Sequence, residues 1–563
     1  MRGKPQRKGE NNMKIKKIMA MLLAMVMVLG MTVTASAAEA DEADDGIVGT
    51  SDDKGTITVS GIDAEANNEN LKVTAYPIVK ATYDPTKGNF TGYDVVYKGV
   101  QPAIDLEKQD ESGNIEITQA HLNAVIGALD NPSEKYEMTA GSQDDYTATV
   151  PVGSYLVVVS GAEAKVYSPM VVSVNYVNQN GNNAIQGGTV TTIKDGNAWV
   201  KETDQPNFTK VEKDAAGNRV DETNYGNSVN VGSKVEYTLT IDPVPYYGGS
   251  HPVFNVVDTL SEGLTYDATS LKVQLVGSSE DAQATVLTEN TDYRFTTQDT
   301  QNLQELTVDF VVNDKYTLND KVTVDSGCKI VITYTATLNE KASLAADTTS
   351  YGENVNTAVL NYTKDSKVSD DTVKDTIEER TYTYSFDLNN FLTKTNEKGD
   401  VTADLTGAKF GLYTDAKCTQ AYKNTFNTSS DLSKGGFYFT DKSGKLSIKG
   451  LEAGTYYLKE LAAPSGYSVN TRVFKIEIVA TYADANTRGK DEGQLTNWTL
   501  EVDENPVTVD NDENPNGFVI KNTKLSSLPS TGGIGTTIFT IGGCAIMIAA
   551  AGLFFASRRK ANK

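Results

Sequence analysis

The C-terminal end of the chain constrains its fold more than any other feature, because it carries an apolar segment long enough to cross a membrane. This segment runs from Ile534 to Ala556. At about 1.5 Å per residue, a helix of that length reaches about 34 Å, and a bilayer core is about 30 Å thick. Four basic residues follow the segment: Arg558, Arg559, Lys560 and Lys563. Basic residues after a span favour a cytoplasmic tail, so the preceding chain is expected to fold on the outer side of a membrane.

The N-terminal end has the pattern of a secretory signal peptide. Three lysines at positions 14, 16 and 17 precede an apolar run from Ile18 to about Val33. Ala35-Ser36-Ala37 then supplies the small side chains of a cleavage site. We therefore expect a signal peptide at 1–37, with an uncleaved N-terminal anchor as the alternative. Residues 38–53 are acidic and small, and we expect them to form a flexible leader.

The charge of the chain and its few histidines and cysteines exclude several classes of function. The chain has 51 Lys and Arg against 74 Asp and Glu, a formal charge of −23. Binding of nucleic acid needs basic patches that neutralise phosphates, so no nucleic-acid partner is expected. Two histidines, His121 and His251, argue against a histidine triad or a multi-histidine metal site. The three cysteines, Cys328, Cys418 and Cys544, fit neither a disulfide framework nor zinc spacing, and we expect no cofactor and no metal.

One segment near the end of the chain resembles the start of an EF-hand loop. It reads Asp512-x-Asn514-x-Asn516-Gly517, but Pro515 lies inside it and Thr523 stands where the loop's last glutamate belongs. We interpret it as a turn before a strand. A surface calcium ion on the acidic loops stays an open question.

Short alternating segments rich in Thr, Val and Tyr predict an all-β chain of several domains. At about 150 residues per domain, a chain of this length corresponds to three or four domains. The expected strands lie at Gly55–Val59, Tyr155–Val159, Met170–Tyr176, 234–241, 253–258, 306–312 and 329–337. One helix is expected near 118–130, where apolar residues recur at helical spacing before Asn131-Pro132. Strands about ten residues apart favour immunoglobulin-like sandwiches for the second and third units.

Polar residues fall on the apolar faces of three expected strands in the third unit. Alternate residues of a strand share one face. The three sets are Phe386, Leu388, Leu392 and Lys394; Tyr456, Leu458 and Glu460; and Phe518, Ile520 and Asn522. A buried unpaired charge costs several kcal/mol, so the lysine and the glutamate should be neutral or paired. From alternation alone, a buried Lys–Glu ion pair beside an amide is the preferred interpretation.

A covalent alternative uses the same three residue types. Burial lowers the pKa of a lysine and leaves a neutral amine that can act as a nucleophile. Burial also raises the pKa of a glutamate, whose protonated carboxyl can polarise an amide carbonyl. Attack of the amine on the asparagine side chain would release ammonia and leave an intramolecular isopeptide bond.

The motif around Glu460 favours the covalent alternative. Tyr456-x-Leu458-x-Glu460-x-x-Ala463-Pro464-x-Gly466-Tyr467 resembles the E-box of Gram-positive pilins, which lies in Cna B-type domains. Leu461 replaces the threonine that usually follows the glutamate. The resemblance implies that Glu460 catalyses a bond between Lys394 in the first strand and Asn522 in the last.

The second unit resembles the Cna A-type middle domain of backbone pilins. The resemblance rests on Phe254-Asn-Val-Val-Asp258-Thr-Leu-x-x-Gly263-Leu-Thr-Tyr266, on Asn356-Thr357-Ala358 and on Phe208-Thr-Lys210-Val. It implies that Asp258 catalyses a Lys210–Asn356 bond. Lys213 is an alternative for the lysine and Asn361 for the asparagine. The first unit resembles pilin N-terminal domains more loosely, in Val73–Ile78 and Val152–Val157.

The C-terminal pattern resembles the cell-wall sorting signal of Gram-positive surface proteins. Leu528-Pro529-Ser530-Thr531-Gly532 precedes the apolar span and the basic tail. The resemblance implies that a sortase cysteine attacks the carbonyl of Thr531, releases Gly532 and passes the thioester to an amine. In backbone pilins that amine is a lysine in a Val-Tyr-Pro-Lys-like motif at the first domain junction. Val200-Lys201 occupies this place without the Tyr and Pro, so Lys201 is either the acceptor or an ordinary solvated lysine.

Together these features predict a secreted, wall-anchored structural protein. The expected divisions are a signal peptide 1–37, leader 38–53, N-terminal pilin domain 54–198, Cna A-type domain 199–363, linker 364–380, Cna B-type domain 381–524, sorting motif 525–532, transmembrane segment 533–556 and cytoplasmic tail 557–563. We predict a pilus shaft subunit, with a monomeric adhesin or a minor basal pilin as the alternative. The implied partners are a pilus-specific and a housekeeping sortase, other copies of the chain, minor pilins, peptidoglycan and host or matrix ligands. No constellation of enzyme residues is evident, so we do not expect a turnover enzyme.

Overall fold

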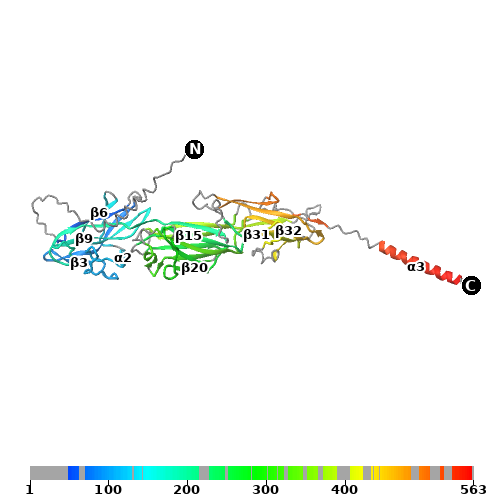
Figure 1. Ribbon diagram of the computed structural model, residues 1–563, viewed down its shortest axis with the longest axis horizontal. Coiled ribbons are helices and arrows are strands. Elements are labelled where there is room, and N and C mark those ends of the chain that lie inside the picture. The colour runs from blue at the N-terminus through cyan, green and yellow to red at the C-terminus, as the bar shows by residue number, and fades with distance from the viewer. Residues whose placement is uncertain are drawn as a thin grey trace, which may run out of the picture.

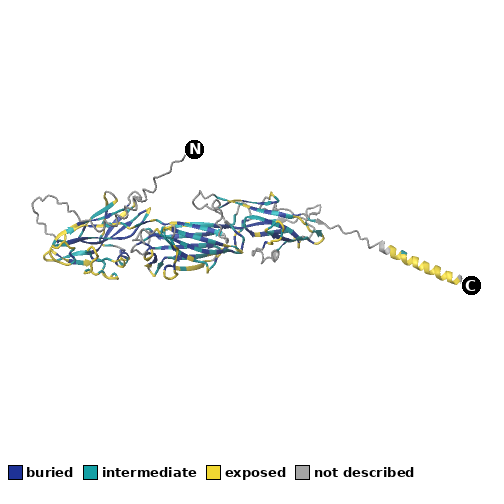
Figure 2. Cartoon of the chain, in the orientation of Figure 1, coloured by how far each residue is buried: buried dark blue, intermediate teal, exposed yellow. Residues whose placement is uncertain are grey.

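The computed structural model places three β-rich domains in a row, with a helix beyond the third (Figure 1). It describes residues 49–62, 70–129, 132–141, 144–214, 227–247, 252–279, 282–300, 302–313, 315–322, 327–345, 351–364, 372–389, 406–422, 433–434, 437–442, 444–483, 494–507, 520, 522–524 and 535–560. The expected signal peptide, the sorting motif and the EF-hand-like segment lie outside these residues. Buried residues run along the inside of all three domains (Figure 2). The prediction of an all-β chain of tandem sandwiches is confirmed.

The first domain packs two sheets around an apolar core. One sheet has the strand order β11-β1-β6-β5 and the other β10-β9-β7-β2-β3, with β4 beside β2. The elements are β1 (Lys54–Ser60), β2 (Lys72–Tyr83), β3 (Phe90–Val95), α2 (Gln119–Ile126), β4 (Tyr136–Glu137), β5 (Thr139–Ala140), β6 (Asp145–Pro151), β7 (Gly153–Ser160), β8 (Lys165–Tyr167), β9 (Met170–Asn178), β10 (Val190–Lys194), β11 (Gly196–Trp199) and β12 (Glu202–Asp204). Strand β1 puts alternate residues into the core, as expected for a strand with one buried face.

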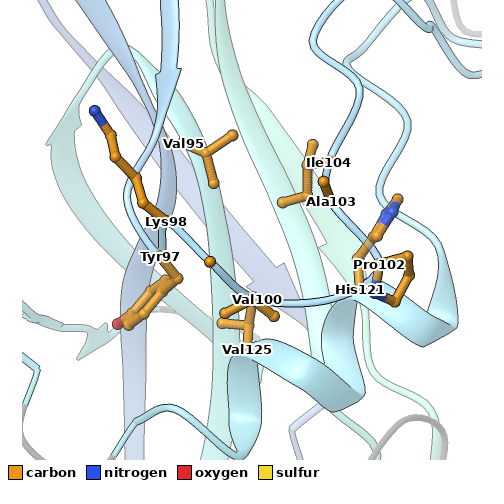
Figure 3. Close-up of a pocket in the computed structure, with 10 residues that line it drawn as sticks. Val95, Tyr97, Lys98, Val100, Pro102, Ala103, Ile104, His121 and Val125 are labelled. Carbon is orange, nitrogen blue, oxygen red and sulfur yellow. The ribbon is translucent and has the colours of Figure 1, made fainter.

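The expected helix is confirmed as α2, and it covers the outer face of the second sheet. Thr118 caps it by accepting the N–H of His121 on its side chain. Leu122 and Val125 of the helix pack on Tyr76 and Leu156 of β2 and β7. These two strands are therefore buried on both faces, which explains their continuous apolar runs. A pocket of about 180 Å³ lies between α2 and the segment after β3, with mostly apolar lining (Figure 3).

The second domain is a sandwich of two six-stranded sheets. One has the order β13-β15-β24-β18-β19 with β17 beside β24, and the other β14-β26-β25-β16-β21-β20. The elements are β13 (Asn207–Asp214), β14 (Asn227–Ser228), β15 (Lys234–Asp242), β16 (Phe254–Ser261), β17 (Leu264–Tyr266), β18 (Lys272–Val276), β19 (Thr285–Val286), β20 (Arg294–Thr300), β21 (Leu303–Asp309), β22 (Val311–Val312), β23 (Lys315–Tyr316), the short 3-10 helix η1 (Thr317–Asp320), β24 (Lys329–Leu338), β25 (Asn354–Thr363) and β26 (Thr372–Tyr382). The four strands predicted in this unit are present.

The charge of residues 364–380 predicts a linker, and this prediction is wrong for β26. That strand pairs with β25 from Asn354 opposite Thr381 to Thr363 opposite Thr372. Val373 and Ile377 pack against the core, Lys374 between them is exposed, and Glu378 pairs with Arg380 further along the strand. Asp375 and Glu379 share the face of Val373 and Ile377, so charged residues stand on both faces of β26 and the strand resembles a linker in the sequence.

The boundary between the first two domains also differs from the predicted 198/199. β12 pairs with β8, so the chain stays with the first domain as far as Asp204. Ser168 of the first domain donates its hydroxyl to the carbonyl of Tyr246, 3.0 Å away. Tyr362 donates to the side chain of Gln205 at 3.1 Å. The two domains are thus joined by direct polar contacts as well as by the chain.

The third domain has a seven-stranded sheet of order β29-β30-β28-β32-β34-β35-β36 and two paired segments, β27-β31 and β33-β37. Its elements are β27 (Tyr384–Asn389), β28 (Lys409–Tyr413), β29 (Ser433–Lys434), β30 (Phe437–Phe439), β31 (Lys445–Leu451), β32 (Gly454–Ala462), β33 (Tyr467–Ser468), β34 (Val473–Tyr482), β35 (Leu495–Val502), β36 (Asn505–Val507) and β37 (Thr523–Lys524). Its core includes the buried Trp498. The helix α3 (Gly535–Lys560) follows, and its segment Ile538–Arg559 is long and apolar enough to cross a membrane.

The junction of the second and third domains is tied by a short segment before β15. The side-chain oxygen of Asn230 accepts hydrogen bonds from the Tyr422 hydroxyl at 2.6 Å and from the backbone N–H of Glu452 at 2.9 Å. Ser228 accepts the N–H of Ala453, and Val231 donates to Gly450, both at 3.0 Å. Several of these partners lie on or beside β31, so the two sandwiches meet through hydrogen bonds on both sides of Asn230.

Candidate crosslinking sites

Lys210 of β13 points into the core of the second domain, where it meets an acid from the opposite sheet. Its side chain has no exposed surface, and its Nζ lies 2.7 Å from Oδ1 of Asp258 in β16. Nζ also donates to the backbone carbonyl of Asn356 in β25 at 3.0 Å. Asp258 and Asn356 both lie on buried faces, as the alternation predicts. The structure therefore brings together the three residues selected in this unit.

Burial dominates the electrostatics of this cluster. It lowers the pKa of Lys210 from its ordinary value, and the carboxylates of Asp258, Glu379 and Glu212 oppose that effect. The ammonium also lies 5.2 Å from the ring centre of Tyr237. A lysine in such surroundings is closer to a neutral amine than a lysine in water, while Asp258 is placed to accept its proton.

A tyrosine connects the acid to the asparagine. The Tyr334 hydroxyl donates to Oδ2 of Asp258 at 2.7 Å and accepts the side-chain N–H of Asn356 at 2.7 Å. Tyr334 lies on β24, in the same sheet as Lys210. The side-chain oxygen of Asn356 is buried without a hydrogen-bond partner among the described residues. The Asn356 side chain thus makes a hydrogen bond through its nitrogen, while its carbonyl oxygen accepts none from the described residues.

The two alternative residues in this unit lie outside the cluster. Lys213 is partly exposed and lies 4.0 Å from Glu236 on the outer face. Asn361 donates its side-chain N–H to Asn255 at 2.9 Å, also away from the buried face. Because side chains alternate along a strand, an odd step from Lys210 or Asn356 reaches the opposite face.

In the third domain, Glu460 and Asn522 are in direct contact. Glu460 is buried in β32, on the same face as Tyr456 and Leu458. The side-chain nitrogen of Asn522 donates to both carboxyl oxygens of Glu460, at 2.8 and 2.7 Å. Burial raises the pKa of Glu460, although N–H groups of Asn470 and Asn522 oppose this by hydrogen bonding. The third selected residue, Lys394, lies outside the described residues.

Comparisons with known proteins relate the chain to bacterial surface proteins. The family profile SpaA, a prealbumin-like fold domain, matches residues 391–493, and the LPXTG cell wall anchor motif matches residues 520–563. The trypsin-resistant surface T6 protein of Streptococcus pyogenes serotype M6 is 26% identical over 465 residues, which cover 72% of this chain and 79% of that protein. The chain is similar to Gram-positive backbone pilins. It is a structural pilus subunit of the cell surface, with a sortase-type cell-wall anchor, and not an enzyme.

Solved pilin structures also align with this pilin over most of its length. The T6 backbone pilin of serotype M6 Streptococcus pyogenes is 19% identical, with a TM-score of 0.47, over 85% of this chain and all of that one. The full-length major pilin SpaD of Corynebacterium diphtheriae is 18% identical, with a TM-score of 0.41, over 85% of this chain and 98% of that one.

Lys201 of the pilin lies in the short connection between β11 and β12. Its side chain is exposed, and its backbone carbonyl accepts the N–H of Ser168 at 2.8 Å. The neighbouring Trp199 is 75% exposed. The lysine is therefore accessible on a backbone that a hydrogen bond holds in place. The residues of the sorting motif, Leu528, Pro529, Ser530, Thr531 and Gly532, lie outside the described residues.

Several residues around Lys210 were not selected from the sequence. Tyr334 and Tyr237 share a cross-strand pair, and their rings lie 5.4 Å apart beside the lysine. Glu212 is buried on the same face as Lys210 and accepts the Thr381 hydroxyl. An alternating strand marks each of them as inward-facing, but a buried tyrosine is so common in β-sandwiches that nothing in the pattern separates Tyr334 from core packing.

Proposed function

We propose that this pilin polymerises into a covalent pilus shaft whose domains are closed by intramolecular isopeptide bonds. A sortase would join the Thr531 carbonyl of one subunit to Lys201 of the next. Lys210–Asn356 and Lys394–Asn522 would be the internal bonds, promoted by Asp258 and Glu460. A pilus-specific sortase would build the polymer, and a housekeeping sortase would attach it to peptidoglycan together with minor pilins.

The buried cluster of Lys210, Asp258 and Asn356 carries the proposal. Shielding an ammonium wholly from water costs desolvation free energy, and its attraction to one carboxylate can fail to offset that cost. Transfer of its proton to Asp258 over 2.7 Å leaves two neutral groups next to an amide. The amine nitrogen can then form a bond to the side-chain carbonyl carbon of Asn356 while ammonia leaves, so charge is removed from the core and not merely balanced.

The Glu460–Asn522 contact supports the second internal bond. Burial raises the pKa of Glu460 and so favours its protonated form, which can deliver a proton to the Asn522 amide nitrogen 2.7 Å away. The lysine of this bond, Lys394, rests on the resemblance to Cna B-type domains. Both proposed bonds form once per molecule, so neither is a turnover reaction.

The exposure of Lys201 at the first domain junction supports its role as acceptor. An amine that attacks the thioester of an acyl-enzyme must reach the sortase cleft, and a solvated lysine in a short connection between two strands meets that requirement. The missing Tyr and Pro before it favour the second candidate function, a monomeric wall-anchored adhesin or basal pilin with the same domains.

Two measurements test the proposal on the chain as its host makes it. Wall extracts should contain a ladder of covalent multimers that disappears in Lys201→Ala and persists in Lys194→Ala, which changes another exposed lysine of the first domain. Digests should contain branched peptides joining Lys210 to Asn356 and Lys394 to Asn522, each lighter by one ammonia. A single monomer band in the wild type would favour the adhesin, and linear peptides only would refute the internal bonds.

A further inference from the structure

The hydrogen bonds of the second domain form a continuous path from the proposed nucleophile to the proposed leaving group. Lys210 Nζ contacts Oδ1 of Asp258, and the Tyr334 hydroxyl contacts Oδ2 of the same carboxyl. The same hydroxyl contacts the side-chain nitrogen of Asn356. Each of the three contacts is 2.7 Å long. Among the described residues, no hydrogen bond joins Asp258 directly to Asn356.

Breaking the Asn356 amide requires a proton on its nitrogen, because an amide anion is a very poor leaving group. Asp258 is the carboxyl that contacts Lys210 among the described residues, and Tyr334 lies between it and that nitrogen. In the third domain no residue stands between the acid and the amide, since the Asn522 side chain donates directly to both carboxyl oxygens of Glu460. The two sites therefore differ in how a proton reaches the nitrogen that leaves.

We propose that the Tyr334 hydroxyl is a catalytic proton relay for the Lys210–Asn356 bond; the inference rests on the crosslink proposed above. Lys210 first gives one proton to Asp258. The Nζ electron pair then forms a bond to Cγ of Asn356, and the carbonyl π electrons move to Oδ1. Rotation of the Asp258 carboxyl turns its proton toward the Tyr334 hydroxyl, which takes that proton and gives its own to the amide nitrogen in the same step.

The remaining steps restore the tyrosine and balance the protons. The bond from Cγ to the side-chain nitrogen of Asn356 breaks with its electrons on nitrogen, ammonia leaves, and the carbonyl forms again. The extra proton on Nζ passes to Asp258. Five protons, three from the ammonium and two from the amide, end as three on ammonia, one on the new amide and one on the Asp258 carboxyl. Tyr334 is unchanged.

The surroundings of Tyr334 suit this role. Burial raises its pKa, so the hydroxyl keeps its proton in the resting protein. Its ring packs edge-on against Tyr266, with 5.7 Å between ring centres, and lies near Tyr237. Most of its contacts are therefore made by the ring, and removal of the oxygen alone leaves the packing in place.

The chain offers a matched control for this substitution. Tyr237 is also buried beside Lys210, but its hydroxyl contacts Thr381 and not the acid or the amide. Tyr334→Phe and Tyr237→Phe each remove one buried hydroxyl from neighbouring rings. A structural effect should be similar in both, whereas a relay is present in only one.

The test follows both branched peptides over time after a pulse of synthesis of the full chain. General acid catalysis contributes about 10²–10⁴-fold, so Tyr334→Phe should slow the Lys210–Asn356 bond at least about a hundredfold. The Lys394–Asn522 bond should form at the wild-type rate in the same molecules, and Tyr237→Phe should change neither bond. Formation of the Lys210–Asn356 bond at the wild-type rate in Tyr334→Phe would overturn the relay alone. Its absence from the wild type would overturn the crosslink and the relay together.

A second variant keeps the test decisive if Tyr334→Phe does not fold. Fluorinated tyrosines in place of Tyr334 preserve the ring and the hydroxyl but make the phenol progressively more acidic. A relay predicts that the rate of Lys210–Asn356 bond formation changes progressively across the series while the third-domain rate stays constant. A constant rate at both sites would reduce Tyr334 to a packing residue.

Discussion

Lys210 and Asp258 lie on different sheets of the second domain and meet with 2.7 Å between Nζ and Oδ1, both almost wholly shielded from solvent. Asp258→Asn keeps the shape of the acid but removes its charge and its ability to take a proton. We expect this variant to lack the Lys210–Asn356 bond and to retain the amide. Lys210 and Asn356 are 146 residues apart, and without the bond the loop between these two residues is no longer closed. By analogy with disulfides that close loops of such length, the free energy of unfolding should fall by about 4–5 kcal/mol, as measured by calorimetry.

Asp267→Asn is the control for this first prediction. Asp267 pairs with Lys234 at 2.8 Å in the same domain, but the lysine side chain is 57% exposed. Exposed pairs are screened by water, so the stability of this variant should match that of the wild type, and its mass should show the same loss of ammonia. Equal losses of stability in the two variants would argue against a special role for the buried pair.

A second prediction concerns the pH dependence of the third domain when it cannot crosslink. In Lys394→Ala the bond is absent, and burial keeps the pKa of Glu460 above its ordinary value of 4.5. As the pH rises, the Glu460 carboxyl therefore ionises at a lower pH in the unfolded chain than in the folded one. The free energy of unfolding should therefore be highest below that ordinary value and should fall as the pH rises through the folded pKa.

Fluorescence of the buried Trp498 reports unfolding of this domain, because Trp199 is exposed in another domain. Denaturant midpoints between about pH 4 and pH 8 should decrease with pH in Lys394→Ala relative to Lys394→Ala/Glu460→Gln. Parallel curves for the two variants would contradict the raised pKa.

The third prediction follows from the place of Asn356 in the strand order. A bond from β13 to β25 joins the first strand of the domain to its penultimate one, so β26 lies outside the closed loop. Asn356 is opposite Glu379, so tension at Thr383 would open the β25–β26 hairpin from the end near the crosslink. Single-molecule stretching should release residues 357–382 only, an extension on the order of 85–95 Å at about 3.3–3.6 Å per residue. Asp258→Asn should extend much further, and equal extensions would rule out the bond as a mechanical stop.

The sequence predicts the faces of these strands better than it predicts their edges or their partners. Alternation alone places Asp258 and Asn356 on buried faces, because burial of one face imposes a period of two. The same reasoning overlooks β26, whose two faces both carry charge, as a linker would. It also assigns no role to Tyr334, because the partners of its hydroxyl lie on β16 and β25. These strands are distant from Tyr334 in the chain and belong to the opposite sheet.

A fourth prediction concerns the contact at Asn230, which no sequence pattern marks. Its side-chain oxygen accepts from Tyr422 and from the Glu452 N–H across the junction of the second and third domains. Asn230→Ala leaves both donors without this acceptor, at a cost of about 1–3 kcal/mol for a buried group. The Glu452 N–H should exchange with solvent faster in the variant, as followed by hydrogen exchange, while the β15–β24 amides of the second domain keep their protection. Asn339→Ala is the matched control, because Asn339 bonds Glu262 and Thr265 within one domain. Unchanged exchange at Glu452 in Asn230→Ala would mean that the apolar contacts of the junction hold the two sandwiches together without this hydrogen-bonded side chain.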